Sequence, residues 1–509
     1  MKLFGLGLMI LVDVLTAQAG EYTYLTRQSL NVHMGSIIYQ FPAEEAGDME
    51  FTNGETLTIM GKTMELSAID SITINESTVQ DNAVSITYSG TTATVAIAGN
   101  VAPYVTATVN GAHVSIEQTN TDAVDGDEIT YTLSGETTNG SFSLSGSYKC
   151  TLALAGLTMT NPSGAAINID NSKRVQISAK KNSENTLTDG SNGSQKGCIY
   201  SKGQIQLQGN GTLNVKGNTK HAIKSGDYIS IKNLTLNITK AVKDGISCNE
   251  YFLMESGTVT ISGVGDEGIQ CELDGTTSTG ATTDHEDEDS GNIYIEGGSL
   301  SVTSTKGEGI ESKGELMISG GSVTVNAKDD AINAASHLTI SGGTVYACST
   351  GNDGIDANGN CYIKGGLIFA IGARQPEVAI DANTERNFKL YVEGGTIIAI
   401  GGLERGSSLT QSCYQTSSWS TNKWYALTIG DETIAFKTPS SGGNGLVVSA
   451  STQPTLKQNV TVGDGTSVFG GNGYTNATVS GGTTVTLSNY SGEGGGPGGG
   501  GGPGGGPWW

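Results

Sequence analysis

The sequence predicts an all-β protein whose central part is a right-handed, three-faced parallel β-helix, with β structure before and after it. The first observation is an internal repeat, because versions of the pattern Asp353-Gly-Ile-Asp-Ala357 recur with isoleucines at 223, 246, 269, 310, 332, 355 and 380. The second is composition: 75 of 509 residues are glycine, only 9 are proline, and valine and isoleucine dominate the apolar residues, which favours strands joined by tight turns.

The N-terminal residues resemble an export signal. In residues 1–19, Lys2 precedes a short apolar run that ends near Leu15, and Ala17-Gln-Ala19 is a small-x-small cleavage site. The run is too short to cross a bilayer, and no later segment reads as a transmembrane helix. We therefore expect a secreted or cell-surface protein.

Two segments separate this signal from the coil. Residues 20–76 read as a small β segment of unknown role, with short strands at 57–59 and 72–74. Residues 77–128 alternate apolar and polar side chains, as half-buried antiparallel strands do. We expect them to form a β module or an N-terminal cap, because an uncovered end of the coil would expose free strand edges.

Residues 129–402 form the predicted coil. The isoleucine spacings are 23, 23, 41, 22, 23 and 25, so residues 272–290 read as one insertion. Each repeat holds three short strands, whose inward pairs in one coil are Ile332/Ala334, Leu338/Ile340 and Val345/Ala347. Within the insertion, residues 284–289 are acidic but lack the glycine of an EF-hand, which favours a flexible loop.

The C-terminal part is less regular. Residues 403–490 contain further strands that either close the end of the coil or run beside it. Residues 491–509 form a glycine- and proline-rich tail that is too poor in apolar side chains to fold.

Charge and cysteine content limit the possible partners. The net charge is -23, with 50 acids against 27 bases, which disfavours nucleic acid and favours cations or ligands held through cations. The seven cysteines show no zinc-like spacing, and we expect most of them to be small core residues. We expect a monomer.

Stacking of the coils places carboxylates at one repeated position, two residues before each isoleucine. Like charges about 4.8 Å apart repel by roughly 1 kcal/mol in water and by more in a partly dehydrated turn. Bound Ca²⁺ is the neutralising partner that we expect, although a solvated acidic edge is the alternative. The candidate metal ligands are Asp330, Asp353, Asp356, Asp329, Glu308, Glu311, Glu267, Asp266, Asp244 and Asp381.

Aromatic residues at outward strand positions form a second candidate feature. Exposed rings in a file can stack on the apolar faces of sugars, unless the C-terminal strands cover them. The candidate ligand-binding residues are Tyr294, Tyr346, Tyr362, Phe369 and Tyr391.

The Asp353-Gly-Ile-Asp356 form, with Asn352 before it and Gly-Gly turns between strands, resembles the calcium-binding β-helix proteins that bind acidic plant polysaccharides such as polygalacturonate. More distantly, it is similar to family 9 pectate lyases. The resemblance covers about residues 125–400 and implies binding of acidic glycans through calcium. Carried over by position, it points first to Asp330, Asp353 and Asp356, although Asn333 stands where a carboxylate is expected.

Three functions remain open from the sequence. The first is a binding module without catalysis, in which Ca²⁺ bridges protein and uronate carboxylates. The second is a calcium-dependent polysaccharide lyase acting by β-elimination, for which Lys313 is the best candidate base. The third is an adhesin or structural protein in which the solenoid is only a spacer.

Overall fold

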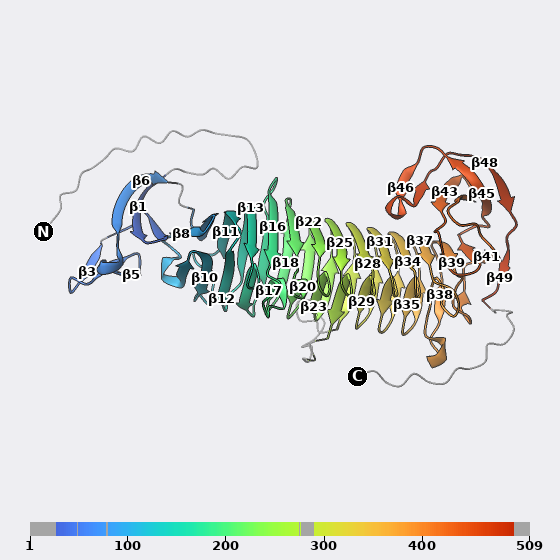
Figure 1. Ribbon diagram of the computed structural model, residues 1–509, viewed down its shortest axis with the longest axis horizontal. Helices are drawn as coiled ribbons and strands as arrows, with labels where there is room; N and C mark the ends of the chain where they lie inside the picture. The colour runs from blue at the N-terminus through green and yellow to red at the C-terminus, as the bar shows by residue number, and fades with distance from the viewer. Residues whose placement is uncertain (1–26, 48, 78–79, 274, 276–289, 493–509) are drawn as a thin grey trace.

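The computed structural model describes residues 27–492, except 48, 78–79, 274 and 276–289. The expected signal at 1–19, the acidic loop at 284–289 and nearly all of the glycine-rich tail lie outside the described residues. The described chain is all-β, with no α-helix, and an elongated coil of strands occupies its centre (Figure 1). Within it, no helix is long and apolar enough to cross a membrane.

The coil consists of three stacks of strands, with one strand from each stack in every regular turn. Every pairing within the stacks is parallel except that of β9 with β10, so the parallel β stacking that the repeat predicts is confirmed. The right-handed sense of the coil stays a prediction. The first stack comprises β9 (Val105–Asn110), β10 (Ala112–Gln118), β12 (Gly140–Gly146), β14 (Ile167–Asn171), β17 (Gly197–Ser201), β20 (His221–Ser225), β23 (Ile246–Asn249), β26 (Ile269–Glu272), β29 (Ile310–Ser312), β32 (Ile332–Ala334) and β35 (Ile355–Ala357).

The other two stacks are joined by the long strand β13 (Cys150–Asn161), which pairs with the first strand of each. The second stack comprises β15 (Val175–Ala179), β18 (Ile205–Gly209), β21 (Ile229–Lys232), β24 (Tyr251–Met254), β27 (Asn292–Ile295), β30 (Leu316–Ile318), β33 (Leu338–Ile340), β36 (Cys361–Ile363) and β38 (Leu390–Val392). The third stack comprises β16 (Glu184–Asp189), β19 (Thr212–Lys216), β22 (Thr235–Lys240), β25 (Thr258–Val264), β28 (Ser299–Ser304), β31 (Ser322–Ala327), β34 (Thr344–Ser349), β37 (Leu367–Ile371) and β39 (Thr396–Ile400).

The core is a set of columns along the coil. The isoleucines from Ile223 to Ile380 pair from each coil to the next, and all are fully buried. The residues two positions later are small and buried, and they include the paired Cys248 and Cys271. All seven cysteines are free and buried, as expected. No single turn could bury this surface alone, so stacking itself provides the hydrophobic stabilisation.

Glycine makes the tight turn between the second and third stacks. Gly343, between β33 and β34, has φ +79°, and an added Cβ would lie 2.7 Å from the carbonyl oxygen of Gly320 in the coil before it. Both the left-handed backbone and the close approach require glycine there. Equivalent glycines with positive φ are Gly298, Gly321, Gly366 and Gly395.

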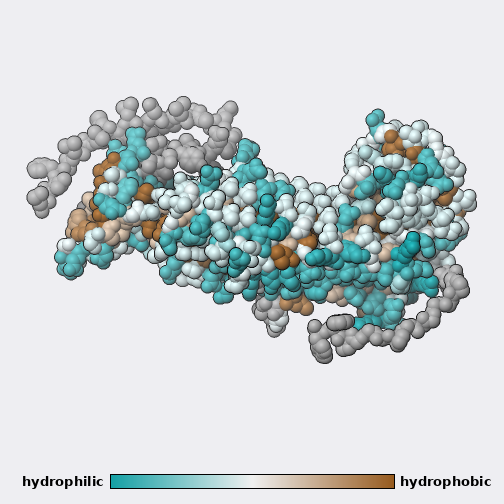
Figure 2. Space-filling model, viewed as in Figure 1, coloured by the Kyte–Doolittle hydropathy of each residue, from teal (hydrophilic) through white to brown (hydrophobic). Residues whose placement is uncertain are grey.

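The N-terminal module continues into the coil. Strand β7 pairs with β8 and β11, and β2 pairs with β8, which links the residues before position 77 to the coil. Hydrophobic side chains gather at this end of the molecule (Figure 2), and Phe51, Ile72 and Ile74 are exposed. The strands are β1 (Arg27–Met34), β2 (Ile37–Pro42), β3 (Glu50–Thr52), β4 (Thr56–Ile59), β5 (Lys62–Glu65), β6 (Ser71–Ser77), β7 (Ala83–Ser89), β8 (Thr92–Ala98) and β11 (Ile129–Thr137).

The C-terminal region forms an antiparallel sheet of six strands beside the end of the coil, and β44 pairs antiparallel with the last strand of the third stack. The sheet packs on the outer side of the third stack, where Phe369 contacts Phe436 and Phe469. The strands of the six-stranded sheet are β42 (Trp424–Ile429), β43 (Glu432–Lys437), β45 (Thr455–Val462), β46 (Thr466–Val468), β47 (Gly473–Thr475) and β48 (Val479–Val485). The other strands of this region, which join the sheet of the coil, are β40 (Ser408–Leu409), β41 (Cys413–Thr416), β44 (Leu446–Ser449) and β49 (Ser488–Tyr490).

Candidate functional site

Stacking gathers the repeated carboxylates along one edge of the coil. The residue two positions before each aligned isoleucine lies where the chain passes from the third stack into the first. Consecutive strands are about 4.8 Å apart, so side chains that are 22 to 41 residues apart in the sequence become neighbours. We call this file the acidic edge, and its acids are Asp244, Glu267, Glu308, Asp330 and Asp353.

At the C-terminal end of the acidic edge, three aspartates converge. Asp353, Asp356 and Asp381 each place a carboxylate oxygen within 4.8 Å of the others, and we call them the aspartate triad. Asp353 is buried and the other two are half-buried. Among the described residues, no lysine or arginine forms an ion pair with any of the three.

Backbone groups hold the carboxylates of the edge in place. The Val378 N–H donates to Oδ1 of Asp353 over 2.6 Å, and the Asp353 N–H donates to Oδ1 of Asp330 over 2.8 Å. Asn333 donates its side-chain N–H to the other oxygen of Asp330 over 3.1 Å. Asp330 and Asp353 thus each accept a backbone N–H from the next coil, which fixes their orientation.

Burial disfavours the charged form of these acids. It raises the pKa of Asp353 from 3.8 to about 7, against the lowering effect of the Val378 N–H. It raises the pKa of Asp330 to about 8, helped by repulsion from Asp356, and it raises the pKa of Asp356 and Asp381 as well. The edge therefore binds either protons or another cation near neutral pH.

Two carboxylates beside the middle of the edge, Glu311 and Asp329, have hydrogen-bond or ion-pair partners in the protein. Glu311, on the outer side of β29, accepts a hydrogen bond from Gln270 over 2.8 Å and forms an ion pair with Lys313. Asp329 accepts a hydrogen bond from the Asn352 side chain over 2.8 Å. Glu311 and Asp329 thus have protein partners, whereas burial raises the pKa of Glu308 to about 7.

Lys313 is poorly suited to the role of a base in this arrangement. Burial lowers its pKa, but the hydrogen bond and negative charge of Glu311 outweigh this effect, and the pKa is raised above its ordinary value. A general base must be unprotonated at the working pH, and these contacts keep Lys313 protonated.

A second acidic group lies near the middle of the coil. Asp244, Asp266 and Glu267 place carboxylate oxygens within 4.8 Å of one another. Burial raises the pKa of both Asp244 and Glu267. The ring of His221, which occupies the same repeated position one coil earlier, lies beside Asp244.

The aromatic residues divide into two groups. Tyr362 and Tyr391, on adjacent strands of the second stack, are half-buried and stacked, with ring centroids 4.9 Å apart and planes 12° apart. Tyr294 is also half-buried and meets Tyr251 edge-on at 6.5 Å. The Nζ of Lys364 lies 5.1 Å from the Tyr362 ring centre.

The expected exposure of the other two aromatics is wrong. Tyr346 is only 5% exposed and Phe369 is fully buried, because the C-terminal sheet packs over these strands of the third stack. They hold the sheet on the coil and cannot face a sugar, which is the alternative that the sequence left open.

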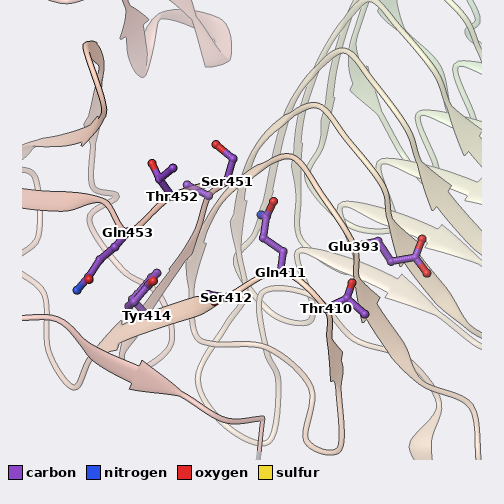
Figure 3. Close-up of a pocket in the computed structure, with 9 residues that line it drawn as sticks. Glu393, Thr410, Gln411, Ser412, Tyr414, Ser451, Thr452 and Gln453 are labelled. Carbon is purple, nitrogen blue, oxygen red and sulfur yellow. The ribbon is translucent and has the colours of Figure 1, made fainter.

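A polar pocket at the end of the coil was missed by the sequence argument. It encloses about 450 Å³ between the last coil and the segment after β44 (Figure 3). Residues of these two segments approach only in the folded protein, and no local motif marks them. The lining residues are Glu393, Thr410, Gln411, Ser412, Tyr414, Ala450, Ser451, Thr452 and Gln453.

The aspartate triad has the chemistry of a hard-cation site. It offers only oxygen donors, from coils that the backbone holds in register, and no protein cation neutralises it among the described residues. Oxygen-only sites with several carboxylates fit Ca²⁺, which accepts irregular ligand geometry.

Comparisons with known proteins find similarity to proteins that are described as carbohydrate-binding. A family model described as "Carbohydrate-binding domain-containing protein" matches residues 110–308 and 289–490. A relative with that description from Acetivibrio thermocellus (strain ATCC 27405) is 27% identical over 136 residues, which cover 23% of this chain and 48% of the relative. The chain thus spans about half the length of this curated relative.

Among solved structures, a polysaccharide lyase-like protein from C. thermocellum, described as a gadolinium derivative, is similar, with a TM-score of 0.37 and 20% identity. The match covers 56% of this chain and 93% of that one. The two family matches together span residues 110–490, well over half of the 509 residues. The chain belongs to the family of carbohydrate-binding domain-containing proteins.

Proposed function

We propose that this protein is a secreted carbohydrate-binding protein that holds acidic, polygalacturonate-like polysaccharides through Ca²⁺ bound on the acidic edge, without catalysis. The observation that carries the proposal is the aspartate triad, in which three carboxylates converge without a protein cation among the described residues. Membership of a carbohydrate-binding family supports the class of ligand. Export rests on the signal-like residues 1–19.

Calcium explains why an acidic protein would bind an acidic polymer. Ca²⁺ takes six to eight oxygen ligands, and the triad with nearby Asp330 supplies only part of such a shell. The remaining positions are open to water or to uronate carboxylates. A bridging ion thus converts repulsion between two anions into attraction, and removing it should abolish binding.

The second stack offers a path for the sugar rings. Tyr362 and Tyr391 form a half-buried stack that suits contact with the C–H face of a pyranose. Strand β38, which carries Tyr391, is followed directly by Glu393 of the polar pocket, so a chain lying along the tyrosines would reach that pocket.

The lyase alternative has one specific candidate, Lys313, and its ion pair with Glu311 argues against it. A lyase would release unsaturated products that absorb in the ultraviolet. A spacer or adhesin without a glycan site would show neither products nor retention.

The test is retention on immobilised polygalacturonate with Ca²⁺ or with EDTA. Fully methyl-esterified polygalacturonate is the matched control, because it has the same backbone without carboxylates. We expect retention only on the free acid, only with Ca²⁺, and without release of unsaturated products. Retention that survives EDTA would refute the calcium bridge. Steady turnover by the wild type that is lost in the Lys313→Ala variant would show that the protein is a lyase rather than a binding module.

A further inference from the structure

The end of the acidic edge nearer the N-terminus differs chemically from the aspartate triad. His221, Asp244 and Glu267 occupy one repeated position in three consecutive coils, two residues before Ile223, Ile246 and Ile269. Asp244, Asp266 and Glu267 place carboxylate oxygens within 4.8 Å of one another, and His221 borders this group through Asp244, with Nδ1 3.0 Å from Oδ2.

These groups are withdrawn from solvent. Asp244 is fully buried, His221 is 5% exposed and Glu267 is 8% exposed. Full burial of a carboxylate is costly unless a charge partner or hydrogen-bond donors compensate it.

The described part of the chain compensates Asp244 only in part. Neither of its oxygens accepts a hydrogen bond from an N–H or hydroxyl group there, and the neighbouring Glu267 carboxyl can donate to Asp244 only when it carries a proton. Nδ1 of His221 lies 3.0 Å from Oδ2 of Asp244, but the two atoms are not aligned for a hydrogen bond, and Nδ1 has no other partner among the described residues. Lys243 pairs with Asp266 on the outer side, 3.6 Å away, and not with Asp244.

We propose that His221, Asp244 and Glu267, with Asp266 at the rim, form a second metal site that selects a transition-metal ion of the Zn²⁺ class over Ca²⁺. The imidazole decides the class of ion, because nitrogen ligands suit zinc, cobalt and nickel, whereas Ca²⁺ prefers oxygen alone. Two buried carboxylates and a rim carboxylate supply the negative charge that a divalent ion needs.

The contacts of the histidine agree with a ligand role. Its Nδ1 lies 3.0 Å from Oδ2 of Asp244 and has no hydrogen-bond partner among the described residues, so no protein group there occupies this ring nitrogen. The site does not depend on glycan binding or on the aspartate triad.

The test uses Co²⁺ as a spectroscopic probe for the Zn²⁺ class. The full-length protein, stripped with EDTA, is titrated with Co²⁺ in millimolar Ca²⁺, and visible absorption reports cobalt in a protein site. We expect saturable bands that Zn²⁺ abolishes and Ca²⁺ does not. His221→Gln should raise the Kd for Co²⁺ by at least about tenfold. His33→Gln, in the N-terminal module, is the matched control and should leave it unchanged.

Two further measurements separate the possible outcomes. The variant D353N/D356N should keep the cobalt signal, since it removes only the aspartate triad, so failure of the calcium proposal would leave this result intact. Zinc X-ray absorption of the wild type should show imidazole scattering, and it needs no folded variant. An all-oxygen zinc shell, or equal cobalt affinity in wild type and folded His221→Gln, would overturn the proposal.

Discussion

Replacing the charge of the aspartate triad should change stability in opposite directions with and without calcium. The perturbation is D353N/D356N, chosen because an asparagine carbonyl can still accept the 2.6 Å hydrogen bond from the Val378 N–H. In EDTA the wild type must bury carboxylates that prefer to be protonated. With Ca²⁺, the proposed site would bind an ion and thereby stabilise the folded state.

The size of the effect follows from the pKa of Asp353, which is about 7 in the folded protein against 3.8 ordinarily. The folded state holds this proton more tightly than the unfolded state, so stability is greatest below pH 4 and falls as pH rises toward 7. Each pKa unit corresponds to about 1.4 kcal/mol, so ionising Asp353 costs on the order of 4 kcal/mol at pH 8. Calcium at one hundred times its Kd would raise the free energy of unfolding by about 2.7 kcal/mol.

The assay is calorimetric melting between pH 4 and 8, in EDTA and in saturating Ca²⁺. In EDTA at pH 8, D353N/D356N should melt several degrees above the wild type. Its Tm should decline less with pH than that of the wild type, although Asp330 and Asp381, whose pKa values are also raised, keep part of the decline. In calcium the wild type should gain stability and the variant should gain little. Asp170→Asn, at an exposed site on β14, is the control and should behave as the wild type does. A wild-type Tm that changes neither with EDTA nor with pH would refute the reasoning.

Three further predictions concern other parts of the molecule. Tyr391→Ala should weaken retention on polygalacturonate in Ca²⁺ by about 1 kcal/mol, because it removes one ring of the half-buried stack, and the melting temperature should barely change. Phe369→Ala should lower the free energy of unfolding by about 3–5 kcal/mol, because it opens a cavity under the C-terminal sheet, and it should leave glycan retention intact at low temperature; loss of retention in the folded variant would contradict its structural role. Gly343→Ala should destabilise the coil by at least about 1 kcal/mol in denaturant titration, because its positive φ and the 2.7 Å approach to Gly320 leave no room for a Cβ. The control Gly430→Ala, at a position with φ +57° but no atom within 4 Å of the added Cβ, should destabilise the protein less.

The sequence was sufficient to predict the stacking because a repeat converts one local pattern into a long-range contact. The buried isoleucine column and the small residues two positions later follow from the period alone. The inward pairs Leu338/Ile340 and Val345/Ala347 are likewise fully buried, since alternation in a strand determines which side chains point inward.

Alternation does not reveal what covers the outward side chains. Tyr346 and Tyr362 both point outward, yet one lies under the C-terminal sheet and the other remains half-exposed. The covering strands lie some 80 to 120 residues later in the sequence and have no repeat to register them. The polar pocket and the lack of N–H or hydroxyl donors to Asp244 among the described residues could not be predicted for the same reason, since both depend on three-dimensional approach rather than on the period of the repeat.

The insertion near position 280 has a practical consequence. The strand before it, β26, pairs in register with β29, with Ile269 opposite Ile310 and Cys271 opposite Ser312. The strand after it, β27, pairs in register with β24, with Phe252 opposite Ile293. The coil therefore tolerates many additional residues at this corner without slipping in register. A foreign peptide or a whole guest domain with adjacent termini could be spliced into the same corner, which makes the molecule a scaffold for displaying cargo midway along a rigid rod.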